Sequence, residues 1–160
     1  MDRQVTSMLK PNIRLFNTPL EVGFRALVIL HQFPDQSLDL EQLMYFDYLS
    51  LNTNDVGGPA SLSAPIPNRG VQVYARKDLL QKGLTILLSK ELIEFVGNER
   101  GFNYSISSAG KKVLELFSTK YFQELDNRTA WVSEKFGKMS VSELRLYMGE
   151  NISHWGGEFL

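Results

Sequence analysis

The two histidines are the first residues to test for chemistry, because imidazole binds metals and transfers protons near neutral pH. His31 and His154 lie far apart in the sequence, and neither belongs to a pair spaced four residues apart on a helix. His31 continues the apolar helical face of Leu27 and Val28, and we expect it on the core side. The histidines therefore predict no metal centre.

Other catalytic constellations are also missing. The run Asp55-Val56-Gly57-Gly58-Pro59 is the one candidate for a phosphate-binding loop, but it lacks the lysine and serine of a P-loop and is more simply a turn. Helix capping explains the carboxylates of Asp39 and Glu41 better than acid–base catalysis. The chain has no cysteine, which excludes a thiolate nucleophile and disulfides. We expect no enzymatic activity and no cofactor.

Basic side chains could instead contact DNA. The net charge is −1, but the stretch from Arg69 to Lys112 carries a net charge of +4 and the remainder −5. Because phosphate neutralisation supplies most non-specific affinity, a chain without an overall basic excess predicts weak, salt-sensitive DNA contact at most. A solvated surface is the simpler alternative for the candidate contacts, which are Arg76, Lys77, Lys82, Arg100, Lys111 and Lys112.

Capping signals define the helices that must position these residues. Residues 1–17 predict an arm, and Thr18-Pro19-Leu20-Glu21 then predicts the start of a helix that ends near Phe33, just before Pro34. Asp39 with Gln42 predicts a second helix, which reaches about Leu51. A third helical pattern extends from Val71 to about Lys90.

The stretch from Asn52 to Gly70 is rich in glycine and proline and predicts a long ordered loop without regular structure. A DNA-reading helix-turn-helix joins its second and third helices by about 3–4 residues, so a loop of this length favours a protein partner. Leu62 and Ile66 either anchor that partner or fold back on the domain's own core. The candidate docking residues are Asp55, Gly57, Gly58, Pro59, Leu62 and Ile66.

The hydrophobic period then changes. Leu92 to Val96 and Phe102 to Ile106 predict two strands joined at a hairpin tip. This order of elements predicts a mainly α fold with a small β-hairpin: a winged helix over residues 18–117, followed by a C-terminal helical extension over residues 118–160. The fold alone does not decide between DNA reading and protein docking.

Two charges stand in otherwise apolar helical stretches. Arg25 lies within the first predicted helix and Asp47 within the second. A buried pair of opposite charge would explain both residues.

Several fragments together resemble a known family. They are Phe16-Asn17-Thr18-Pro19-Leu20-Glu21-Val22-Gly23-Phe24-Arg25-Ala26-Leu27, Asp47-Tyr48-Leu49 followed by Asp55-Val56-Gly57-Gly58-Pro59-Ala60-Ser61-Leu62, Arg128-Thr129-Ala130-Trp131-Val132, and Trp155-Gly156-Gly157-Glu158-Phe159. From about Phe16 to Phe159 the chain resembles the middle components of ABC-ATPase three-component conflict systems, which include the Lamassu-type anti-phage systems.

The resemblance implies a non-catalytic winged-helix accessory subunit. Its partners would be a coiled-coil ABC ATPase, related to chromosome-maintenance and double-strand-break-repair ATPases, and an effector that is often a nuclease. The subunit would help to couple DNA sensing to the effector. A free-standing winged-helix transcriptional regulator is the alternative, but a regulator usually has a basic domain.

The sequence also predicts where in the cell the protein is located. No apolar run follows the charges of the N-terminus, and no uninterrupted apolar stretch approaches the length of a membrane span. With no cysteine, the chain fits a reducing compartment. We expect a cytoplasmic protein that has no contact with a membrane.

Overall fold

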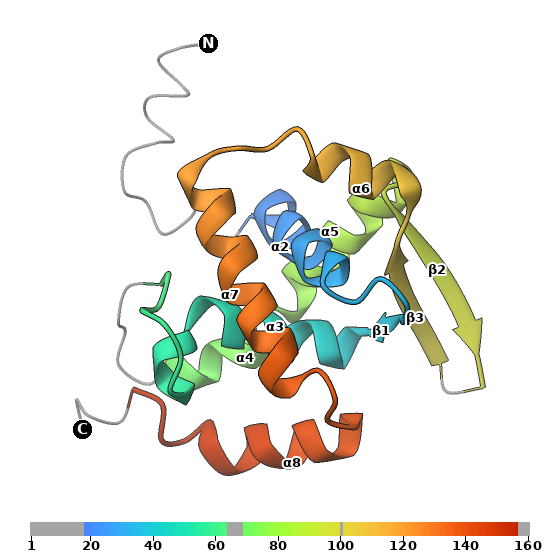
Figure 1. Cartoon of the computed structure of the whole chain (residues 1–160). Coiled ribbons are helices and arrows are strands. Elements are labelled where there is room, and N and C mark those ends of the chain that lie inside the picture. Colours follow the sequence, from blue (N-terminus) through green and yellow to red (C-terminus); the bar gives the residue numbers. More distant parts are fainter. Residues whose placement is uncertain (1–17, 64–68, 100, 157–160) are drawn as a thin grey trace.

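The computed structural model describes residues 18–63, 69–99 and 101–156. The chain is mainly helical and has one small antiparallel sheet (Figure 1). The prediction of a mainly α fold with a β-hairpin is confirmed. The predicted arm, residues 1–17, lies outside the described residues.

The first two helices begin where their capping residues predict. The Thr18 side chain accepts a hydrogen bond from the Glu21 N–H at 3.1 Å, and this cap starts α2 (Pro19–His31). After β1 (Leu38–Asp39), Asp39 and Gln42 form the predicted capping box of α3 (Leu40–Leu51). The prediction for His31 is wrong: it is exposed, because it is the last residue of α2, where the chain turns away from the packed part of the helix.

The third helical region is broken by a short kink. It comprises η3 (Arg69–Val71), α4 (Gln72–Ala75) and α5 (Lys77–Ser89), and α5 packs closely against α2. Two glycines allow this approach, because a Cβ atom at Gly83 would lie 2.7 Å from the Gly23 nitrogen and 2.6 Å from the Pro19 carbonyl oxygen. Gly83, which costs helix propensity, therefore sets the distance between the two helices.

Gly83→Ala is expected to lower the free energy of unfolding by about 1–3 kcal/mol, because backbone atoms of α2 cannot move aside as a side chain can. The matched control is Gly149→Ala within α8 (Val141–Asn151), where nothing lies within 4 Å of an added Cβ. Its helix propensity should raise the stability by up to about 1 kcal/mol. Urea unfolding of both variants measures the difference, and equal effects would show that the helix contact does not depend on Gly83.

The predicted hairpin is confirmed as β2 (Ile93–Asn98) and β3 (Gly101–Ile106). The third strand, β1, joins it to give the order β1-β3-β2. The sequence does not predict β1, because two residues cannot display an alternating pattern.

The C-terminal part is helical, as predicted. It comprises α6 (Ser108–Leu114), α7 (Lys120–Phe136) and α8, whose first turn holds a capping box of Ser140 and Glu143. The face of α7 that carries Leu125 and Val132 is buried against α2 and α3.

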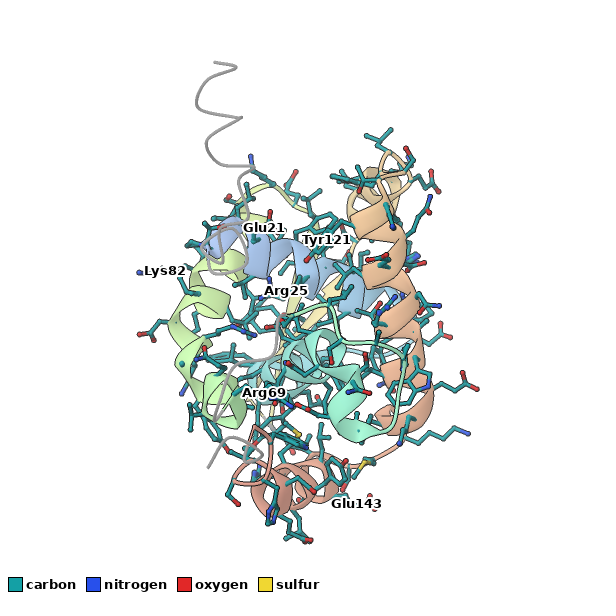
Figure 2. The ribbon with its side chains drawn as sticks, turned by 90° about the vertical axis from the view of Figure 1, so that its left-hand side faces the viewer. Glu21, Arg25, Arg69, Lys82, Tyr121 and Glu143 are labelled. Atoms are coloured by element: carbon teal, nitrogen blue, oxygen red, sulfur yellow. The ribbon has the colours of Figure 1, made fainter. Side chains whose placement is uncertain are left out.

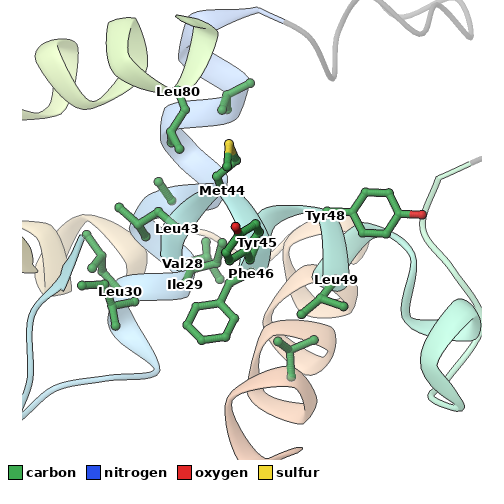
Figure 3. Close-up of a cluster of buried hydrophobic side chains, with 14 of the residues drawn as sticks. Val28, Ile29, Leu30, Leu43, Met44, Tyr45, Phe46, Tyr48, Leu49 and Leu80 are labelled. Carbon is green, nitrogen blue, oxygen red and sulfur yellow. The ribbon is translucent and has the colours of Figure 1, made fainter. Parts of the chain in front are cut away.

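A continuous hydrophobic core joins these elements. Figure 3 shows its centre, where side chains of α2 and α3 meet Leu80 of α5, and the same core extends to Trp155. The C-terminal helices thus share their core with the rest of the chain. In the described ranges, no helix combines the length and the apolar character needed to cross a membrane.

Candidate functional site

The predicted docking loop is held to its own domain at its start. The predicted absence of regular structure is wrong here, because Thr53–Val56 forms a 3-10 helix, η2. Tyr48 donates a hydrogen bond to the largely buried Asp55 carboxylate at 2.8 Å, and Arg69 forms an ion pair with it at 2.6 Å. Burial, and then the Asp55 hydrogen bond, raises the pKa of Tyr48 above its ordinary value. Asp55 thus links α3 to the far end of the loop.

The glycine turn of the loop packs against α7. A Cβ at Gly58 would lie 2.7 Å from the Trp131 ring, and Lys135 donates a hydrogen bond to the Val56 carbonyl at 2.6 Å. Gly57 has a φ of 81°, in the left-handed region that favours glycine, and is exposed. Packing therefore explains Gly58, and backbone conformation explains Gly57.

The rest of the loop makes further contacts with its own domain. The Pro59 carbonyl accepts a hydrogen bond from Thr53 at 2.8 Å, and Arg128 donates to the Ala60 carbonyl at 3.0 Å. Leu62 is half-buried and packs against the core, as the alternative interpretation expects, whereas Ile66 lies outside the described residues. A docking role for the loop stays a prediction.

The predicted pairing of Arg25 with Asp47 is confirmed. Arg25 Nε donates to Asp47 Oδ1 at 2.6 Å, both side chains are buried, and Arg76 approaches Asp47 Oδ2 at 3.5 Å. Burial alone would raise the pKa of Asp47, but the charges and hydrogen bonds of Arg25, and then Arg76, hold it below its ordinary value. Figure 2 shows Arg25 inside the molecule, near Glu21 and Tyr121. The three charges tie α2 and α3 to the start of α5.

The predicted DNA-contacting residues do not form one equivalent set. Arg76 is mostly buried beside Asp47, and Arg100 lies outside the described residues. Figure 2 places Lys82 at the edge of the molecule. The exposed members are Lys77, Lys82, Lys111 and Lys112.

The hairpin carries an exposed aromatic surface that was not among the residues predicted from the sequence. The strand register places Phe95 opposite Tyr104 and Gly97 opposite Phe102, so these side chains share one face of the sheet. The face begins in the core at Ile93, but Phe95 is 48% exposed and Phe102 is 66% exposed. Their ring centroids lie 4.9 Å apart, and the Tyr104 ring lies 5.7 Å from that of Phe95. We call Phe95, Phe102 and Tyr104 the aromatic face.

Acidic residues lie along β2, which carries part of the aromatic face. Glu91 precedes β2, Glu94 lies within the strand, and Glu99 stands at the hairpin tip, and all three are exposed. The exposed Lys90 precedes Glu91, so three carboxylates outnumber one basic side chain among the described residues from Lys90 to Glu99, and this balance disfavours contact with phosphate.

One signal in the sequence could have identified this surface. The pattern of Phe95, Phe102 and Tyr104 predicts strands, and their type is the one most enriched at protein interfaces. Whether such residues are buried depends on how far the hairpin extends beyond the core, which the sequence does not reveal.

A second apolar patch lies where α2 begins. Leu116 is 82% exposed, and Leu20 and Phe117 are also exposed. Leu20, Glu21, Phe24, Phe117, Thr119 and Tyr121 line a groove of about 320 Å³ here. This patch provides a comparison for any test of the aromatic face.

The contacts of the described residues do not add a candidate catalytic site. His31 and His154 are both exposed; His31 ends α2, and His154 lies in the turn that follows α8. Across the residues that the structure describes, no three histidine, aspartate or glutamate side chains are grouped closely enough to hold a metal ion.

Comparison with known proteins identifies the chain's relatives. The model of one family, ABC-three component (ABC-3C) system Middle Component 2, matches residues 15–158. No curated protein and no solved structure matches the chain. The family match covers the core, the loop and the hairpin alike, and it agrees with the resemblance seen in the sequence. The chain therefore belongs to the Middle Component 2 family of ABC-three component systems and is an accessory component of an ABC-ATPase system.

Proposed function

We propose that this chain is a non-catalytic winged-helix subunit that docks on the coiled-coil ABC ATPase of its system through the aromatic face of its hairpin. The order α2, β1, α3, α5, β2, β3 supports the winged-helix assignment, with β2 and β3 as the wing. In this proposal the third helix and the wing present a surface to protein instead of reading bases.

The observation that carries the proposal is the exposure of Phe95 and Phe102. Exposed aromatic side chains are costly to leave in water and supply much of the binding energy at protein interfaces. Because the two rings already contact each other, their conformations are restricted before a partner binds. An interface at this hairpin would gain affinity from both effects.

The wider role follows from the family. Membership of an ABC-3C system implies partner components, and we propose that the ATPase senses foreign or damaged DNA while this subunit helps to transmit the signal to an effector such as a nuclease. An anti-phage role of the Lamassu type is part of this proposal. The exposed lysines of α5 and α6 would add at most weak, salt-sensitive contact with DNA.

The double variant Phe95→Ser with Phe102→Ser is expected to bind the ATPase component at least about 30-fold more weakly, because each side chain is placed to act as an interface hot spot. Calorimetry or co-purification with the ATPase measures the loss. The control is Leu116→Ser, which removes an even more exposed apolar side chain from the second patch and should leave the affinity unchanged.

The thermal midpoint of each variant distinguishes lost contact from lost structure. Full binding by the double variant, or loss of binding only in Leu116→Ser, would overturn docking through the aromatic face. If the isolated wild-type chain instead bound one DNA sequence tightly at physiological salt and ignored the ATPase, it would be a free-standing regulator.

A further inference from the structure

The geometry of the hairpin points to the way in which the partner binds. We infer that the outer edge of β2 accepts an extended segment of the ATPase component as an additional strand of the sheet. This inference rests on the proposed docking and specifies its chemistry. The aromatic face would then bind alternate side chains of the added strand, while backbone hydrogen bonds hold the strand itself.

The direction of the β2 backbone can be determined from one hydrogen bond. Ser107 N–H donates to the Leu92 carbonyl at 3.1 Å, so the backbone groups of Leu92 face β3. Successive residues of a strand direct their N–H and C=O groups to opposite edges. In β2 those of Glu94 and Val96 therefore face β3, whereas those of Ile93, Phe95 and Gly97 face outward.

The outward edge is open in the described structure. The sheet order β1-β3-β2 places β2 at one margin, and Figure 1 shows no helix or strand beyond it among the described residues. Such an edge presents unpaired donors and acceptors and is a template for another strand.

The charges around β2 indicate which side chains the added strand should carry. Along β2, Phe95 lies on the aromatic face and Glu94 on the opposite face, with Glu91 and Glu99 at the two ends. An added strand that alternates apolar and basic side chains would satisfy both faces at once. A second copy of β2 would instead bring six carboxylates to one interface, which disfavours a homodimer.

Gly97→Pro tests strand addition directly. Proline removes the outward N–H and places its ring on the open edge, but the ladder to β3 does not use that N–H. We expect the variant to fold with an unchanged thermal midpoint and to bind the ATPase component about tenfold more weakly or worse. Gly97→Ala is the matched control: it keeps the N–H, its Cβ would have no neighbour closer than 4.0 Å, and its affinity should equal that of the wild type.

Hydrogen exchange provides a second measurement on the wild-type complex. The amides of Phe95 and Gly97 should exchange quickly in the free chain and become protected when the ATPase binds. Binding that leaves these amides unprotected, or is equal for Gly97→Pro and wild type, would overturn strand addition but leave docking intact. Failure of the wild type to bind at all would refute the proposed function itself. A β2-mediated dimer of the free chain, lost in Gly97→Pro, would assign the edge to a second copy and overturn the inference.

Discussion

Replacing Asp47 with asparagine is expected to lower the free energy of unfolding by about 3–5 kcal/mol. The substitution leaves the size of the side chain nearly unchanged but removes its charge. Arg25 would then be buried without the carboxylate that forms its ion pair, and it has no path to solvent because its side chain is fully covered. Arg76 is partly exposed and can turn towards water, so the cost arises mainly at Arg25.

A surface ion pair provides the matched control. Arg145 holds the Glu41 carboxylate at 2.7 Å, but both side chains are accessible to solvent. Glu41→Gln should therefore change the stability by less than about 1 kcal/mol. Urea denaturation of the two variants compares equal chemical changes at buried and exposed sites. Equal losses would contradict the assignment of Arg25 and Asp47 as a buried pair.

The dependence on pH should separate charge from packing. Because the folded state holds the pKa of Asp47 below its ordinary value of 3.8, the pair's contribution is present above that value and is lost as the pH falls through the lower folded pKa. The stability difference between wild type and Asp47→Asn should thus be constant from pH 7 to pH 5 and shrink only in stronger acid. A difference that disappears already near pH 6 would assign the effect to another group.

The sequence predicted this pair because both residues break an apolar pattern. An arginine and an aspartate on adjacent helices, each surrounded by buried positions, have few arrangements other than facing each other. The hairpin was predictable for a similar reason, since a change of period from helical to alternating is visible within ten residues. Local signals of this kind also gave the caps at Thr18 and Asp39.

The sequence does not reveal contacts between distant segments in the way that it reveals these local features. Lys135 reaches the Val56 carbonyl, and Arg128 reaches the Ala60 carbonyl, across 79 and 68 positions of the sequence. Both bonds use a backbone acceptor, so no complementary side chain marks the site in the sequence. The sequence therefore leaves open whether the loop contacts a partner or its own domain, whereas the structure packs the first half of the loop onto α7.

The aromatic face shows a different limit. The alternation that buries Ile93 and Ile106 is the same alternation that exposes Phe95 and Phe102, because the hairpin extends past the edge of the core. Periodicity gives the face on which a side chain lies, but only the packed helices determine where that face meets solvent.

Trp155→Ala is expected to cost about 3–5 kcal/mol of folding stability, comparable to other large-to-small substitutions of buried aromatic residues. Trp155 is only 6% exposed, and its ring stacks on that of Tyr48 at a centroid distance of 5.0 Å. The indole covers the tyrosine whose hydroxyl holds Asp55, so its loss would open a cavity beside the anchor of the loop.

Backbone contacts near Trp155 also connect the loop to this part of the chain. The Gly70 N–H donates to the Trp155 carbonyl at 3.4 Å, and a Cβ at Gly70 would overlap the carbonyl of Ile152. The segment after the loop therefore packs directly on Ile152 and Trp155, and its position depends on that of the indole. Trp155→Phe should retain most of the stability, because a smaller ring can still stack on Tyr48.

Chemical denaturation of Trp155→Ala and Trp155→Phe, with His154→Ala as the control, measures how much the folding stability depends on the indole. His154 is the exposed neighbour of Trp155, and its truncation should change the stability by less than about 0.5 kcal/mol. A loss of under about 1 kcal/mol in Trp155→Ala would show that the chain end unfolds separately from the core. With the full loss, the loop, α3 and the chain end form one cooperative unit. The hairpin, whose aromatic face lies outside this unit, could then bind a partner without unfolding it.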